Sequence, residues 1–203
     1  MKTLLTLSLL LFINNQVFSQ KGDWFMGLET GYTSSVLAEP RSLTPDEELD
    51  LFNKQNGLHF GIFTEYFFSR KWSAKLKFKY YEVATIRSRT TLTISQGAIG
   101  QRERYEADIL NIPLFASFHF GKPLLSAHID LGPAYGIELS GGIIGENPVF
   151  EDTSPGFGFG FAIGAESKII SDTIIVFLDY EYYGLDNDIN NRAANLGARI
   201  KLN

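Results

Sequence analysis

Apolar and polar residues alternate with a period of two along eight segments of the chain. Successive side chains of a β-strand point to opposite faces, so this period predicts strands rather than helices. The 19 glycines and the 14% of aromatic residues agree with that assignment. The predicted strands are 23–33, 57–69, 72–86, 105–120, 124–138, 156–170, 173–184 and 192–202.

The connections between these segments alternate between short and long. The tight connections are 69–71, 122–123 and 171–172, and the long polar ones are 34–56, 87–104, 139–155 and a shorter 185–191. Transmembrane barrels show this asymmetry, with short periplasmic turns and longer outer loops. The pattern therefore predicts an all-β fold, an eight-stranded antiparallel up-and-down transmembrane β-barrel.

Each predicted strand has one apolar face and one face that carries the charges. The charged face holds seven acids and six bases, which are Glu29, Glu65, Lys75, Lys77, Lys79, Asp130, Glu138, Glu166, Lys168, Asp179, Glu181, Arg199 and Lys201. A membrane barrel turns its apolar face outward, whereas a soluble barrel of the lipocalin kind turns it inward. Alternation by itself fits both orientations.

Two features indicate that the apolar face meets lipid. Large aromatic residues on that face lie beside the chain start or the tight turns, as an interfacial girdle would: Trp24, Phe68, Trp72 and Phe120. Most strand glycines fall on the charged face instead. The lumen of an eight-stranded barrel is narrow, so small residues are needed there beside long ones.

Strand pairing about the tight turns supports the same orientation. Folding the chain about 69–71 sets Glu65 opposite Lys75, and folding it about 171–172 sets Ile163 opposite Tyr180. Neighbours across strands thus match in kind on both faces. We expect the three lysines of the third strand to point into the lumen, because a charge facing lipid at mid-membrane costs about 2–4 kcal/mol.

The N-terminal segment 1–19 has the features of an export signal. Its apolar run, 4–13, is too short to span a bilayer, and Ser19 is small enough for a signal-peptidase site. We expect cleavage near Gln20, which leaves 20–203 as the barrel domain.

Composition excludes several kinds of site and partner. The chain has no cysteine, so disulfides and thiolate metal sites are ruled out. A formal net charge of −5 argues against nucleic acid as a partner, because phosphate binding needs a basic surface.

Four stretches of the sequence resemble the PorT-like outer-membrane β-barrel family. They are "DILNIPLFASFHF" (108–120), "IDLGPAYGIEL" (129–139), "GFGFGFAIGAE" (156–166) and "LDYEYYGLDN" (178–187). The resemblance covers most of the chain and implies an eight-stranded outer-membrane barrel with a signal peptide. Some members of that family resemble components linked to protein secretion and gliding, which implies such an association here and no role for particular residues.

The three histidines form the first candidate site. His59, His119 and His128 all lie on the charged face of their strands, which is expected to face the lumen. His119 and His128 would be diagonal neighbours across the turn at 122–123. With Asp130 nearby they could hold a metal ion, although a zinc site needs three or four ligands and an ordered surrounding shell. The favoured interpretation is hydrogen-bonded lumen residues.

Carboxylates form the second candidate site. Asp179 and Glu181 share a lumen face, with Glu166 on the adjacent strand, and like-charged neighbours can serve acid–base catalysis. The cations predicted on the flanking strands are Lys168, Arg199 and Lys201. They favour a neutralised ion network over a catalytic site.

Two further catalytic motifs are weak. The stretch "GFGFGFAIG" lacks the following helix that a phosphate-binding loop requires. Hydrolysis of lipid would need a nucleophile at the rim, but no "GxSxG" occurs, and His59 is the histidine predicted at the rim.

The long connection 34–56 contains "TPDEE" from Thr44 to Glu48, a typical helix start. Leu49 and Phe52 would give such a helix one apolar side. The segment is interpreted either as a cap over the barrel mouth or as a surface that binds a partner.

The sequence thus predicts a non-enzymatic barrel of the outer membrane that acts as a structural or interaction component of the envelope. Its expected partners are outer-membrane lipid and a protein that contacts the outer loops 34–56, 87–104 and 139–155. No catalytic, cofactor-binding or metal-binding residue is assigned. A lipid-modifying enzyme and a soluble periplasmic barrel for an apolar ligand are the alternatives.

Overall fold

The computed structural model describes residues 21–37, 51–53, 55–93, 97–122, 125–144, 156–170, 173–185 and 189–202. Within them the chain forms strands only. The strands are β1 (Trp24–Leu37), β2 (Leu51–Asn53), β3 (Gln55–Phe67), β4 (Trp72–Thr93), β5 (Gly97–Lys122), β6 (Leu125–Ile144), β7 (Phe157–Ile170), β8 (Ile174–Leu185) and β9 (Ile189–Lys201). In this part of the chain, no helix is long and apolar enough to cross a membrane.

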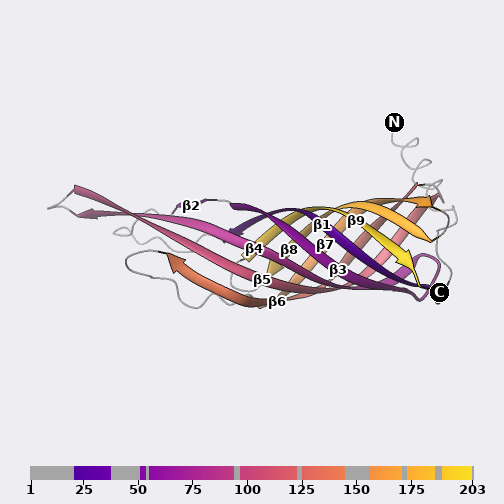
Figure 1. The fold of residues 1–203 in the computed structure, drawn as a ribbon. Coiled ribbons are helices and arrows are strands. Elements are labelled where there is room, and N and C mark those ends of the chain that lie inside the picture. The colour runs from indigo at the N-terminus through magenta and orange to yellow at the C-terminus, as the bar shows by residue number, and fades with distance from the viewer. Residues whose placement is uncertain are drawn as a thin grey trace, which may run out of the picture.

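Eight of these strands close into an antiparallel barrel (Figure 1). From β3 to β8, each strand pairs with the one that follows it in sequence. β1 pairs with both β3 and β9 and closes the circle. The short β2 lies outside this circle and pairs only with β4 among the described strands. The predicted eight-stranded up-and-down barrel is confirmed.

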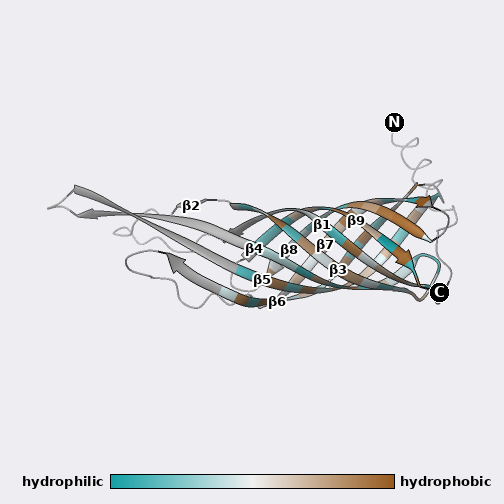
Figure 2. Cartoon of the chain, viewed as in Figure 1, coloured by the Kyte–Doolittle hydropathy of each residue, from teal (hydrophilic) through white to brown (hydrophobic). Residues whose placement is uncertain are grey.

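The apolar face of every strand points outward. Leu58 is 77% exposed and Leu28 66%, whereas Lys77 and Glu65 are fully buried. Brown and teal therefore alternate along the strands in Figure 2. An outward apolar surface of this kind needs lipid around it, so the soluble barrel with an inward apolar face is wrong.

The outer surface has the dimensions of a membrane-spanning band. Aromatic pairs at the end with the tight turns form one girdle; in one of them, the rings of Trp72 and Phe118 lie 4.9 Å apart. Asp108 lies on β5 ten residues before Phe118, and it accepts hydrogen bonds from Tyr80 (2.8 Å) and Ser140 (2.5 Å). At about 3.3 Å per residue and a tilt of about 40°, this interval spans about 25 Å, the height of the apolar band of an outer-membrane barrel.

The register follows the predicted pairing. Glu65 lies opposite Lys75, and Ile163 lies opposite Tyr180. One pairing differs, because His119 lies directly opposite His128 and not diagonal to it. β5 ends at Lys122 and β6 begins at Leu125, so the turn lies one residue later than the predicted 122–123, which changes the pairing from diagonal to direct.

The long connections are shorter than predicted because strands continue beyond the membrane band. The predicted loop 87–104 is wrong: β4 extends to Thr93 and β5 begins at Gly97, and the two pair throughout this hairpin. The start of the predicted loop 139–155 is also wrong, because β6 continues to Ile144. Outside lipid neither face of a strand must be apolar, so the period of two is lost while the backbone pairing continues.

The connection 34–56 also contains strand. Residues up to Leu37 belong to β1, and Phe52 lies in β2, where it pairs with Arg87. Phe52 is therefore not on the predicted helix. The helix start from Thr44 to Glu48 lies outside the described residues.

Lumen glycines make room for aromatic rings on the adjacent strands. A Cβ atom at Gly197 would lie 2.2 Å from Cζ of Phe177, its partner across the β8–β9 ladder, and one at Gly27 would lie 2.2 Å from Cζ of Phe63. No side chain fits at such distances. The expected placement of small residues in the lumen is confirmed.

The substitution Gly197→Ala tests this packing. The added methyl group would displace Phe177, so we expect a loss of about 1–3 kcal/mol in the free energy of unfolding. Urea titration of the barrel in lipid vesicles measures it. Gly184→Ala is the matched control, because its Cβ would meet no atom closer than 3.6 Å. Equal stability losses in the two variants would contradict the packing account.

Candidate functional site in the barrel lumen

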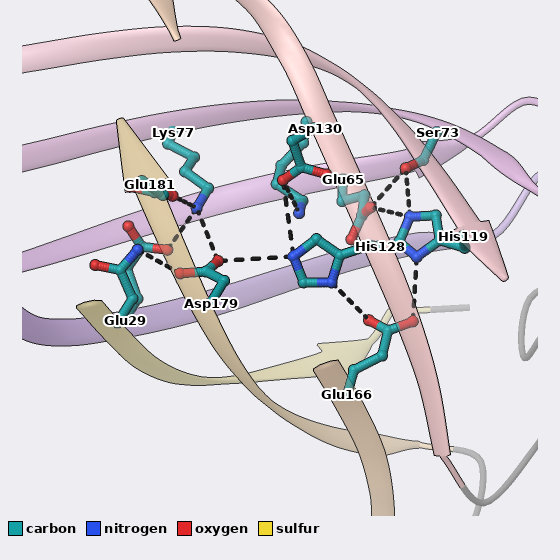
Figure 3. A network of polar contacts seen from close by, with 12 residues as sticks. Glu29, Glu65, Ser73, Lys77, His119, His128, Asp130, Glu166, Asp179 and Glu181 are labelled. Carbon is teal, nitrogen blue, oxygen red and sulfur yellow. Dashed lines mark hydrogen bonds and ion pairs between the residues drawn. The ribbon is translucent and has the colours of Figure 1, made fainter. Parts of the chain in front are cut away.

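The lumen is filled by charged side chains that pair across it. Ten acidic or basic residues are no more than 3% exposed: Glu29, Glu65, Lys75, Lys77, Lys79, Asp130, Glu166, Asp179, Glu181 and Arg199. Period-two alternation on seven of the eight barrel strands places them there. Figure 3 shows most of them as two groups of contacts joined through His128.

The first group surrounds two lysines of β4. Lys77 Nζ lies 2.8 Å from Glu29 Oε2 and also donates to Glu181. Lys79 Nζ lies 3.1 Å from Glu29 Oε1 and donates to the other oxygen of Glu181. These contacts connect β4 with β1 and β8. Because β8 lies opposite β4, the two lysines link opposite walls of the barrel.

The second group surrounds Arg199 on β9, nearer the tight turns. Its guanidinium group donates one hydrogen bond to Glu65 and another to Glu166 Oε2 at 2.7 Å. His119 lies between the same two carboxylates, with Nε2 3.0 Å from Glu65 and Nδ1 3.1 Å from Glu166. The carboxylates of β3 and β7 are thus bridged twice.

The partners differ in part from those predicted. Glu65 lies opposite Lys75 in the ladder, but Lys75 instead reaches across to Asp130 at 2.7 Å. Lys201 pairs with Asp23 at 2.8 Å near the end of the barrel and stays outside the network. Strand register fixes which residues are adjacent, whereas long side chains in a narrow lumen also reach residues on strands that are not adjacent.

The histidine metal hypothesis does not fit this geometry. Both ring nitrogens of His119 are used by carboxylates, and Nε2 also lies 3.0 Å from Ser73 Oγ. His128 Nε2 is 3.9 Å from Asp130 and 3.7 Å from Asp179, and the two rings lie 5.8 Å apart.

One carboxylate group within the described residues has metal-like spacing, but lysines already fill it. The ligand oxygens of Glu29, Asp179 and Glu181 lie within 4.8 Å of one another. Lys77 and Lys79 place their ammonium groups among these oxygens. The cluster therefore acts as a site for the protein's own cations.

Aromatic residues of the lumen were not singled out from the sequence. Phe25, Phe67 and Ile175 form a buried cluster at the end with the tight turns, and the two phenylalanine rings lie 5.6 Å apart. The Arg199 guanidinium group lies over both rings, at 5.1 and 5.6 Å. Their alternation with outward residues is the sequence feature that indicates the lumen, because each lies on the charged face of its strand.

A family comparison identifies the class of protein. Residues 16–190 match the family described as "Outer membrane protein beta-barrel domain". The chain belongs to this family. Together with the outward apolar band, this places the protein in the outer membrane, with the tight turns on the periplasmic side. Among curated proteins, none matches this outer-membrane barrel.

Three solved structures of outer-membrane proteins are similar to this chain, and the first of them, OprG, shares its fold. OprG from Pseudomonas aeruginosa has a TM-score of 0.57 at 10% identity, over 92% of this chain and 99% of that one. Ail from Yersinia pestis has a TM-score of 0.47 at 15% identity, over 90% and 100%. Neisserial surface protein A has a TM-score of 0.49 at 11% identity, over 88% and 97%.

The substitution Arg199→Met tests the lumen network. It removes the guanidinium group that both Glu65 and Glu166 bind, so we expect the free energy of unfolding in vesicles to fall by about 3–5 kcal/mol. Adding Glu65→Gln and Glu166→Gln should recover part of that loss.

Lys201→Met is the control for charge removal. It breaks the pair with Asp23, in which the lysine side chain is 27% exposed, and should cost less than about 1 kcal/mol. If Arg199→Met were no more costly than Lys201→Met, the network would not stabilise the barrel.

Proposed function

We propose that this outer-membrane barrel is a non-enzymatic structural or interaction component of the cell envelope. The observation that carries the proposal is the contrast between a lumen crossed by buried ion pairs and a paired sheet that continues beyond the membrane band. The part of the described chain that is available for contact with other proteins therefore lies outside the lipid.

The lumen contacts argue against transport of solutes. Lys77 and Lys79 on β4 cross the lumen to Glu181 on β8. Nearer the periplasm, Arg199 binds Glu65 and Glu166, which lie on opposite walls. Below Arg199, the rings of Phe25 and Phe67 pack together. An eight-stranded barrel is only wide enough to be filled by side chains such as these.

The external sheet supports a contact role. Beyond Glu82, β4 continues for eleven residues to Thr93, or about 36 Å at about 3.3 Å per residue. It pairs with β5 along this length, and Figure 1 shows the hairpin projecting far beyond the barrel. Strand β2 adds to its edge opposite 86–88, which brings part of connection 34–56 into the same sheet.

Two finer parts of the proposal come from the sequence. The PorT-like resemblance of 108–120 and 178–187 supports an association with a secretion assembly. The short apolar run within 1–19 supports export by a cleaved signal peptide, with 20–203 as the mature barrel.

The location of His59 argues against the lipid-modifying alternative. His59 was expected at the rim, but it is 2% exposed and lies inside the lumen, opposite Tyr81. A general base must come within hydrogen-bond reach of the group it deprotonates. A buried ring in the lumen cannot reach lipid at the outer surface.

Site-specific photo-crosslinking in cells tests the contact role. A photoreactive residue at Thr91, near the tip of the hairpin, should give discrete protein adducts. The control is the same residue at Leu131, which is 58% exposed on the lipid face and should give no protein adduct above background. Equal adduct yields at both positions would contradict a contact role for the hairpin.

Planar-bilayer recording tests the closed lumen. The purified barrel should give no stable stepwise conductance, because the buried ion pairs and the Phe25–Phe67 contact occupy the pore. A large porin reconstituted in parallel is the positive control. Long-lived uniform steps from this protein would show an open channel and overturn the structural assignment.

A further inference from the structure

The acidic and basic side chains of the described lumen are unequal in number. Among the ten charged residues that are no more than 3% exposed, six are carboxylates: Glu29, Glu65, Asp130, Glu166, Asp179 and Glu181. Four are cationic: Lys75, Lys77, Lys79 and Arg199. The difference leaves two negative charges inside a wall that faces lipid, where an unpaired charge is strongly unfavourable.

The hydrogen bonds of His119 identify one compensating charge. Ser73 Oγ donates its single hydrogen to Glu65 Oε1 at 2.5 Å, so toward His119 Nε2 it can only accept. Glu65 Oε1 also only accepts, and it lies 3.0 Å from Nε2. Nε2 therefore carries a proton.

The other nitrogen of His119 carries a proton for the same reason. Nδ1 lies 3.1 Å from Glu166 Oε1, which already accepts a hydrogen bond from Ser126 Oγ at 2.8 Å. Arg199 binds the second oxygen of Glu166 and of Glu65, which favours the ionised form of both carboxylates. With both nitrogens protonated, His119 is an imidazolium ion.

His128 lies among three carboxylates, and neither of its ring nitrogens makes a hydrogen bond. Its Nε2 is 3.7 Å from Asp179 and 3.9 Å from Asp130, and its Nδ1 is 3.8 Å from Glu166. Figure 3 shows the ring between these three carboxylates, which come from β6, β7 and β8. Their cations are Lys75 on β4 for Asp130, Lys77 on β4 for Asp179 and Arg199 on β9 for Glu166.

His59 lacks the hydrogen bonds that His119 makes. It is buried, but neither of its nitrogens has a hydrogen-bond partner, and no described carboxylate lies within ion-pair distance of it. It pairs across the ladder with Tyr81 and belongs to the outer half of the lumen. A neutral ring is expected there.

We infer that the lumen binds one proton as a structural cation on His119, which adds a fifth cation to the four basic side chains that face the six carboxylates. The stability of the barrel then depends on pH. Loss of this proton breaks the His119 bridge between Glu65 on β3 and Glu166 on β7.

Histidine-selective 15N NMR of the barrel in lipid nanodiscs tests the charge states. The chain has only three histidines, so three pairs of ring nitrogens are expected. At about pH 8, where a histidine in water is almost wholly neutral, the ring of His119 should have both nitrogens protonated. His119→Gln should remove this imidazolium signal. A spectrum with no imidazolium ring, or an imidazolium signal that survives His119→Gln, would overturn the inference.

The pH dependence of unfolding in urea gives a second test. Because the unfolded chain releases this proton near pH 8, the native state binds more protons and stability falls as pH rises. The unfolding equilibrium constant should rise about tenfold per pH unit near that pH.

Variants assign that dependence to His119. His119→Gln should make the unfolding equilibrium constant nearly independent of pH near pH 8, whereas His59→Gln should leave the rise at about tenfold per pH unit. A flat dependence in the unmodified protein, or an equal reduction by His59→Gln, would contradict a bound proton at His119. The slope is read independently of any overall loss of stability.

Discussion

The structure depends on keeping charge out of lipid while filling a narrow lumen with it. Each strand alternates between an outward apolar residue and an inward one, and ten of the inward residues are charged and almost fully buried. Desolvating them is costly unless each carboxylate meets a cation. The barrel meets this requirement with shared contacts, in which Lys79 and Arg199 each bind two carboxylates and Lys77 binds three.

The same narrow space explains the other lumen residues. Aromatic rings pack between the charged groups and the periplasmic end, and glycines on adjacent strands leave room for them, as Gly197 does for Phe177. Arg199 joins the two kinds of packing, because its guanidinium group binds Glu65 and Glu166 and lies over Phe25. Ionic and apolar contacts therefore act together, and the lumen is a solid core rather than a pore.

Much of this architecture could be predicted from the sequence, because lipid imposes a strict period of two on every membrane-spanning strand. That period gave eight strands, their faces and the opposition of Glu65 and Lys75. It failed beyond the membrane, where the β4–β5 hairpin is paired without an apolar face. It also could not assign ion pairs, since Lys75 reaches Asp130 across the lumen and not its ladder neighbour.

The central claim is that one strand face contacts acyl chains and the other fills the lumen. Isoleucine methyl NMR in lipid nanodiscs tests it without any substitution. Ile62, Ile163 and Ile200 are outward and 47–53% exposed, whereas Ile109 and Ile175 are inward and at most 1% exposed. The δ1 methyl groups of the first three should show nuclear Overhauser contacts with lipid acyl protons, and those of the other two should show none. Acyl contacts at Ile109 and Ile175, with none at the first three, would contradict the account.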